Sequence, residues 1–165
     1  MSDNQAASAD VSLVGKIVYI EDDPISVMLV QSLVDMLYPR VELLHADSAA
    51  TGIRLVRRKQ PDLVLLDMHL PGATGIDVLR ELNPEVSTQG LRVTLLTADA
   101  ATPSVIKAMS LGAYEYWRKP LNLALFRNGV RRALTGSLPD ASCRLPSLRV
   151  QRRPDYSDEV RPGEG

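Results

Sequence analysis

The sequence predicts a doubly wound α/β domain, in which a parallel β-sheet lies between two layers of helices. Short apolar runs typical of strands alternate along the chain with segments of helical periodicity. Some of these runs, such as residues 63–66, are apolar at every position. A strand of this kind is buried on both faces, which indicates a sheet with helices on each side.

Strands are expected at five apolar runs, which are residues 16–20, 41–44, 63–66, 93–96 and 114–117. Helical spacing of apolar residues predicts three helices between the first four strands, marked by Ile25, Met28, Leu29 and Leu33, by Ile53 and Val56, and by Ile76 and Leu79.

A fourth helix is expected to begin near Thr102 and Pro103, since threonine caps helices and proline suits the first turn. Gly112 is expected to stop it. A fifth helix presents Phe126, Val130 and Leu134 on one face.

The chain has the size of one domain with tails, since it has 165 residues of which 45% are hydrophobic. We expect a disordered N-terminal tail over residues 1–13 and a domain over residues 14–135. Beyond that, Pro, Gly and Arg punctuate a stretch with few large apolar residues. We interpret residues 136–165 as a disordered Pro/Arg-rich tail or linker.

The charge balance gives no reason to expect direct binding to nucleic acid or to an anionic membrane, because 19 basic residues face 20 acidic ones. No signal-peptide pattern or membrane-spanning run is evident in the sequence. Cys143, the single cysteine, cannot form an internal disulfide. We therefore expect a soluble, cytoplasmic protein.

Polar residues stand where the predicted strands end, and ligands of open parallel sheets bind at that edge. Glu21, Asp22 and Asp23 follow the first strand, and Asp67 follows the third. Thr97 follows the fourth strand and Lys119 the fifth. Carboxylates, a hydroxyl and an ammonium group are thus expected to converge.

Carboxylates packed together repel one another unless a cation lies between them. Oxygen ligands without clustered His or Cys favour Mg²⁺ over zinc. A phosphoryl group beside Asp67 would be neutralised by the metal and Lys119 and would accept a hydrogen bond from Thr97. Asp67 itself would be the nucleophile, giving an aspartyl phosphate.

These residues resemble the signature of the receiver domain of two-component response regulators, including its chemotaxis-type members. The motifs are Glu21-Asp22-Asp23-Pro24, the segment from Asp67 to Gly75, Thr97-Ala98 and Lys119-Pro120. Asp67 follows Asp22 by 45 residues, Thr97 follows Asp67 by 30, and Lys119 follows Thr97 by 22. The resemblance covers about residues 14–135 and implies a flavodoxin-like receiver fold with strand order 2-1-3-4-5.

The resemblance implies a role for each matching residue. Asp67 corresponds to the phosphoacceptor, and Mg²⁺ would be held by Asp22, by Asp67, by the carbonyl of His69 and, through water, by Glu21. Thr97 and Lys119 would bind the phosphoryl group, with the Lys119–Pro120 peptide in the family's cis form.

The resemblance also implies a switch. Tyr116 matches the aromatic that changes rotamer with Thr97 on activation, and His69 and Asp99 match positions that tune the lifetime of the phosphoryl group. Thr74, where the family more often has an acidic residue or serine, and Glu21, where many members have aspartate, are departures. Asp23 is interpreted as the cap of the first helix.

The implied function is a signalling switch rather than a turnover enzyme. A sensor histidine kinase or a histidine phosphotransfer protein would donate the phosphoryl group. The surface of the fourth helix, fifth strand and fifth helix would bind a downstream protein or a second copy. No effector domain is recognised after residue 135, so the chain would act alone or belong to a longer regulator.

Three alternative functions are less well supported by the sequence. A phosphatase of the haloacid dehalogenase type would have an aspartate two residues after the nucleophile, where this chain has His69. A flavin or nucleotide binder would need a phosphate-cradling loop after the first strand, which Glu21, Asp22 and Asp23 would oppose. The third is a degenerate, non-phosphorylated receiver that acts as a scaffold.

Overall fold

The structure is a computed structural model that describes residues 8–99 and 102–140. The tail expected over residues 136–165 therefore lies mostly outside the described residues, as do Cys143 and the first part of the expected N-terminal tail.

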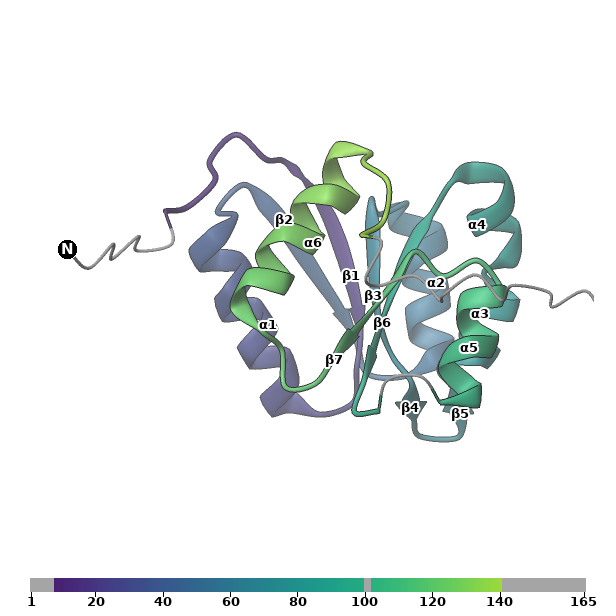
Figure 1. Ribbon diagram of the computed structural model, residues 1–165. Helices are drawn as coiled ribbons and strands as arrows, with labels where there is room; N and C mark the ends of the chain where they lie inside the picture. Colours follow the sequence, from purple (N-terminus) through teal and green to yellow (C-terminus); the bar gives the residue numbers. More distant parts are fainter. Residues whose placement is uncertain (1–7, 100–101, 141–165) are drawn as a thin grey trace, which may run out of the picture.

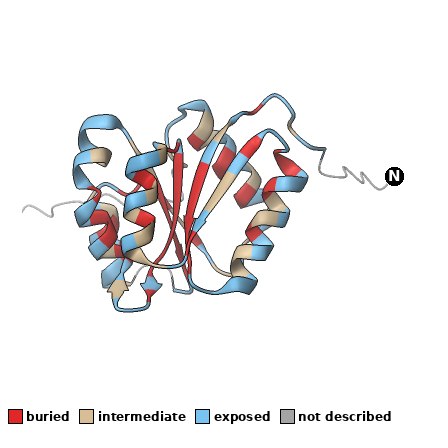
Figure 2. Cartoon of the chain, turned by 180° about the vertical axis from the view of Figure 1, so that it is seen from behind, coloured by how far each residue is buried: buried red, intermediate tan, exposed pale blue. Residues whose placement is uncertain are grey.

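A five-stranded sheet forms the centre of the molecule, and all of its strand pairs are parallel. The strand order β2-β1-β3-β6-β7 is the predicted order 2-1-3-4-5, because β6 and β7 are the fourth and fifth strands of this sheet. The central strands are almost wholly buried (Figure 2). The strands are β1 (Gly15–Ile20), β2 (Val41–Ala46), β3 (Leu63–Asp67), β6 (Arg92–Thr97) and β7 (Glu115–Arg118).

Helices cover both faces of the sheet, as the apolar strands predict (Figure 1). Two helices, α1 (Pro24–Leu37) and α6 (Leu123–Thr135), pack on one face. The other face carries α2 (Ala49–Lys59), α3 (Gly75–Glu81) and α5 (Pro103–Ser110). Two apolar cores result, one on each side of the sheet. The doubly wound α/β prediction is confirmed.

The fourth predicted helix is α5, and its start is confirmed. Thr102 caps it by accepting a hydrogen bond from the backbone N–H of Val105, and Pro103 occupies the first turn. The helix ends at Ser110, and Gly112 follows with a left-handed φ of 101° that favours glycine.

Two features were missed in the sequence. The helix α4 (Asn83–Gln89) follows α3 almost directly and has no fully buried residue, so it gives no apolar stripe to detect. A small antiparallel hairpin, β4 (His69–Leu70) with β5 (Ala73–Thr74), follows β3. Its turn contains Pro71 and Gly72, and Gly72 has a φ of 72°.

The first helix packs with a different face from the one that its predicted apolar residues suggest. Val30, Val34 and Leu37 are buried, whereas Ile25 is 71% exposed and Met28 is 64% exposed. The helix is apolar on both sides, so periodicity alone does not distinguish the packed face. An apolar strip is thereby left on the surface of α1.

The β7–α6 contact is built around Trp117, which is buried. Its ring meets Phe126 edge to face at 5.8 Å between centroids. Its indole N–H donates to Glu115, a fully buried carboxylate, at 2.8 Å. Arg132 of α6 donates twice to the same carboxylate, at 2.9 and 3.1 Å.

Residues 8–13, which the sequence analysis assigned to the tail, lie against α1 and α6. The backbone N–H of Asp10 donates to the carbonyl of Leu37 at 2.7 Å, and the Asp10 carboxylate pairs with Arg131. Arg127 donates to the carbonyl of Ser8 at 3.0 Å. Within the described part of the chain, no helix is long and apolar enough to cross a membrane.

Candidate functional site

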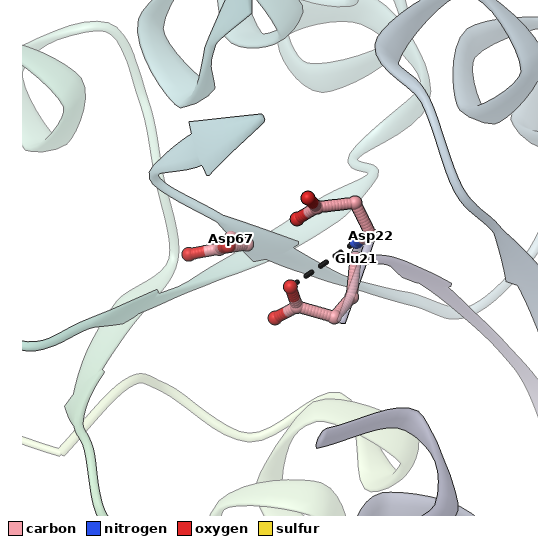
Figure 3. Close-up of side chains that lie close together, drawn as sticks. All are labelled: Glu21, Asp22 and Asp67. Atoms are coloured by element: carbon pink, nitrogen blue, oxygen red, sulfur yellow. Dashed lines mark hydrogen bonds between the residues drawn. The ribbon is translucent and has the colours of Figure 1, made fainter. Parts of the chain in front are cut away.

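Three carboxylates meet at the carboxyl ends of β1 and β3. One oxygen each of Glu21, Asp22 and Asp67 lie within 4.8 Å of one another. Figure 3 shows the three side chains extending toward the same side of the strand ends. Glu21 and Asp67 are buried, whereas Asp22 is exposed. The parallel sheet places these residues together because β1 and β3 are hydrogen-bonded neighbours.

The Glu21 carboxylate is surrounded by donors. Oε1 accepts the backbone N–H groups of Asp22 and Asp23, both at 3.1 Å. Oε2 accepts the hydroxyl of Tyr19 and the ammonium group of Lys119, also both at 3.1 Å. A carboxylate has about four acceptor sites. Because four donors use them, Glu21 has little capacity to bind a metal directly. Its predicted contact with a metal through water stays a prediction.

Lys119 joins the two buried carboxylates. Its Nζ atom lies 3.1 Å from Glu21 Oε2 and 3.4 Å from Asp67 Oδ1. Partial burial acts to lower the pKa of this ammonium group, but the Glu21 hydrogen bond and the Asp67 charge outweigh it and raise the pKa. The group is therefore cationic at neutral pH. The Lys119–Pro120 peptide is cis, as the resemblance implied.

Tyr19 is a buried residue of β1 that the sequence analysis did not select. Burial, followed by the charge and hydrogen bond of Glu21, raises the pKa of its hydroxyl group. The hydroxyl therefore stays protonated and donates to Glu21. A tyrosine two residues before the acidic motif places its side chain on the same face as Glu21, which is the signal that could have identified it.

The loop after Asp67 is held in place by close backbone packing. The N–H of Gly75 donates to the carbonyl of Met68 at 3.0 Å. A Cβ atom at Gly75 would lie 3.2 Å from Met68 Cα and 3.3 Å from the Asp67 carbonyl oxygen. Glycine therefore allows α3 to approach the backbone of Asp67.

Thr74, noted above as a departure from the family pattern, caps α3. Its side chain accepts the backbone N–H of Asp77, and the Asp77 side chain accepts the backbone N–H of Thr74, which forms a capping box. Asp77 was not selected in the sequence, although its spacing from Thr74 fits this motif. The pair fixes the start of the helix that follows the hairpin.

Thr97 lies at the end of β6 with its hydroxyl group turned toward the next loop. It donates to the carbonyl of Asp99 at 2.9 Å and accepts the Asp99 N–H at 3.3 Å. Tyr116 is half-buried on the neighbouring strand, opposite Leu95. Because side chains alternate along strands, Thr97 and Tyr116 project from the same face of the sheet.

The remaining predicted positions border this edge. The N–H of His69 points to Asp67 Oδ1 at 3.4 Å, and the side chains of His69 and Asp99 are exposed. Asp23 caps α1 by accepting the N–H groups of Ile25 and Ser26, which confirms its predicted structural role. His45, at the end of β2, contacts the Glu21 carbonyl through Nε2 at 2.7 Å and secures the loop after β1.

The donor set of this edge fits Mg²⁺. Asp22 and Asp67 offer carboxylate oxygens, and the cluster contains neither Cys nor His side chains. Hard oxygen donors suit Mg²⁺, which retains several waters when one or two carboxylates bind it.

The fold is that of an α/β domain of the flavodoxin-like class, with an acidic cluster at the carboxyl edge of its sheet. The chain belongs to the response regulator receiver domain family, whose model matches residues 17–131. It is thus a receiver domain of two-component signalling.

Known response regulators are similar in sequence over much of the chain. The DNA-binding response regulator MtrA of Mycolicibacterium smegmatis is 32% identical over 152 residues, which are 84% of this chain and 62% of MtrA. The phosphate regulon transcriptional regulatory protein PhoB of Pseudomonas aeruginosa is 33% identical over 67% of this chain and 48% of its own length. The chain therefore spans about half to three fifths of these relatives.

A shorter relative is the sporulation initiation phosphotransferase F of Bacillus subtilis, which is 34% identical over 52% of this chain and 70% of its own length. Among solved structures, a receiver domain protein from Clostridium thermocellum superposes with a TM-score of 0.66 at 29% identity, covering 74% of this chain and 96% of that one. The chemotaxis regulator CheY4 of Vibrio cholerae shares the fold, with a TM-score of 0.65 at 16% identity.

Proposed function

We propose that the domain accepts a phosphoryl group on Asp67 in the presence of Mg²⁺ and changes its protein partners as a result. The observation that carries the proposal is the position of Lys119, whose ammonium group lies within 3.4 Å of Asp67 and 3.1 Å of Glu21. The buried carboxylate of Asp67, the candidate nucleophile, therefore shares one edge of the sheet with the exposed carboxylate of Asp22 and the cation of Lys119.

In the proposed reaction an oxygen of Asp67 forms a bond to phosphorus, and the bond from phosphorus to the donor imidazole nitrogen breaks. The nitrogen keeps the electron pair. Mg²⁺ held by Asp22, Asp67 and the His69 carbonyl, with Glu21 acting through water, would neutralise charge on the phosphoryl oxygens. Lys119 binds one of these oxygens and so lowers the repulsion between the carboxylate and the incoming group.

The switch would use Thr97, whose hydroxyl group is bound to the Asp99 backbone in this structure. A phosphoryl group on Asp67 offers it a charged acceptor, which forms a stronger hydrogen bond than a carbonyl. Movement of Thr97 would open space on the face where Tyr116 lies. The surface of α5, β7 and α6 would then bind a downstream protein or a second copy. His69 and Asp99 border the site and would set the phosphoryl lifetime.

The phosphodonor is proposed to be a sensor histidine kinase or a histidine phosphotransfer protein. Apolar side chains are exposed on the two helices that pack on one face of the sheet: Ile25, Met28 and Leu29 of α1 are 51–71% exposed, and Leu123 and Leu125 of α6 are 43–44% exposed. Leu29 lines the same pocket as Lys119. A donor that delivers a phosphohistidine to Asp67 must approach over this edge. We propose that this donor binds the exposed apolar side chains of α1 and α6.

The test is intact-mass measurement after incubation with Mg²⁺ and acetyl phosphate. The wild-type protein is expected to gain one phosphoryl group, and Asp67→Asn and a sample with excess EDTA are expected to gain none. Failure of the wild type to label, beside a receiver that does label under the same conditions, would favour the scaffold alternative. The expectations of a cytoplasmic location and of no direct nucleic-acid binding stay predictions.

A further inference from the structure

We propose that Tyr19 is a positioning residue that releases Lys119 for the phosphoryl group, an inference that rests on the function proposed above. Tyr19 touches neither Asp67 nor a phosphoryl position by hydrogen bond. Its hydroxyl group and the Lys119 ammonium group share one acceptor, the Oε2 atom of Glu21, each at 3.1 Å. Tyr19 would therefore act through Glu21.

The shared acceptor lies in a buried environment. Glu21 and Tyr19 are each 1% exposed, whereas the Lys119 side chain is 29% exposed. Of the two donors on Oε2, the lysine is flexible and reaches the open edge of the site, while the tyrosine is fixed in the middle of the sheet. The two donors are thus unequal in their freedom to move.

This inequality has an energetic consequence. A buried carboxylate oxygen that loses its last donor incurs a large desolvation cost. When Lys119 moves toward a phosphoryl oxygen on Asp67, the Tyr19 hydroxyl stays on Oε2 and keeps it satisfied. Without this hydroxyl, Lys119 would be the only donor to that atom among the described residues and would be held on Glu21. Tyr19 therefore lowers the barrier to the movement of Lys119.

A purely structural role for Tyr19 is the alternative, since large aromatic residues commonly fill cores. Tyr38 provides the comparison within the same core. It is also fully buried, and its hydroxyl group donates to the backbone carbonyl of Arg127, far from the carboxylates. Both hydroxyl groups are satisfied, but only that of Tyr19 has a partner in the candidate site. The two tyrosines therefore form a matched pair for an experiment.

The experiment compares Tyr19→Phe with Tyr38→Phe, since each variant keeps the ring and removes one buried hydroxyl. Labelling by acetyl phosphate with Mg²⁺ is followed by intact mass, and unfolding by urea is measured in parallel. Tyr19→Phe is expected to label about tenfold more slowly, consistent with the loss of a hydrogen bond to a charged group. Tyr38→Phe is expected to label at the wild-type rate with a comparable loss of stability. Equal labelling rates in both variants would overturn the proposal.

A double-mutant cycle separates an action through Glu21 from a general disturbance. Glu21→Gln removes the charge that holds Lys119. In that background, adding Tyr19→Phe is expected to change the labelling rate less than about twofold. A further tenfold decrease would show that Tyr19 acts by another route.

An NMR measurement on the unphosphorylated protein tests whether Tyr19 positions Lys119, independently of the phosphorylation reaction. The ¹³Cε signal of Lys119 reports the environment of its ammonium group in the unphosphorylated protein. Tyr19→Phe is expected to shift this signal, and Tyr38→Phe is expected to leave it in place. An unshifted signal in Tyr19→Phe contradicts the proposal. If the wild type does not label at all, the proposed function fails. The NMR measurement still decides whether Tyr19 positions Lys119.

Discussion

The backbone of Gly129 lies directly against the indole ring of Trp117. A Cβ atom at Gly129 would be 2.2 Å from Cζ2 and 2.7 Å from Cε2 of that ring. The ring cannot easily retreat, because it is 2% exposed and its N–H is bound to Glu115. The approach of α6 to β7 therefore depends on the absence of a side chain at this position.

Gly129→Ala is accordingly expected to lower the free energy of unfolding by about 1–3 kcal/mol, the usual cost of overpacking a core. The better helix propensity of alanine, about 1 kcal/mol, offsets part of the clash. Urea unfolding followed by far-UV circular dichroism measures the change. In a Trp117→Phe background, the same substitution should cost less, because the smaller ring leaves room. Equal costs in the two backgrounds would contradict the assigned contact.

The buried ion pair of Glu115 and Arg132 gives a second prediction. Arg132→Met is expected to cost about 3 kcal/mol of unfolding free energy, because it leaves a buried carboxylate without its cation. Arg57→Met is the control, since the Arg57 side chain is 44% exposed and its partners Glu81 and Glu85 are 56% and 13% exposed, whereas Glu115 is 0% exposed. The control should cost less than about 1 kcal/mol. Similar losses in the two variants would show that the burial of Glu115 has no special weight.

The capping box of α3 predicts a dependence of stability on pH. The backbone N–H of Thr74, followed by its hydroxyl group, holds the pKa of Asp77 below its ordinary value of 3.8. Because the folded protein binds this proton less tightly than the unfolded chain, the stabilisation is complete above pH 3.8 and is lost as the pH falls through the folded-state pKa.

Asp77→Asn should therefore lower stability at neutral pH and reduce the loss of stability on acidification. Urea midpoints measured between about pH 2 and pH 5 test this expectation, because this range includes the pH values below 3.8 at which the stabilisation is lost. A variant whose midpoint falls as steeply as that of the wild type would show that Asp77 does not contribute to the acid sensitivity.

The packing of Gly75 against the Asp67 loop predicts an effect on the proposed phosphorylation. A Cβ atom at Gly75 would lie 2.9 Å from Met68 Sδ and 3.3 Å from the Asp67 carbonyl oxygen, so alanine must displace the backbone that carries the proposed nucleophile, Asp67. Gly75→Ala is expected to slow labelling by acetyl phosphate about tenfold, since small misplacements of reacting groups are costly. Labelling at the wild-type rate by a folded variant would refute this expectation.

The sequence predicted the sheet and the acidic edge because both depend on local patterns. Continuous apolar runs such as residues 63–66 are visible without knowledge of the fold, and each polar motif directly follows such a run. In the parallel sheet, the neighbouring strands β1 and β3 then bring Asp22 and Asp67 together. Lys119 follows β7, which is separated from β3 by β6, and its long side chain reaches Asp67 at the same edge. The order of the strands came from the family resemblance rather than from the runs themselves.

Features that depend on contacts between distant segments were not predicted. The packed face of α1 was ambiguous because apolar residues stand on both sides of the helix, and the contact with the sheet selects Val30 and Val34. The proposed role of Tyr19 depends on the contact between Glu21 and Lys119, which are 98 residues apart in the chain. The ion pair of Glu115 joins it to Arg132, which is 17 residues away. Neither pairing leaves a periodic trace.

The described chain enters and leaves the domain at the end of the sheet opposite Asp67. Asp10 is bound to the end of α1, and the hydroxyl group of Tyr114, just before β7, donates to the carbonyl of Ser137 after α6. Figure 1 shows these segments at the end of the sheet opposite the β4–β5 hairpin. Fluorophores attached near these two positions would leave the carboxylates accessible, so a labelled protein could report phosphorylation while its donor is bound.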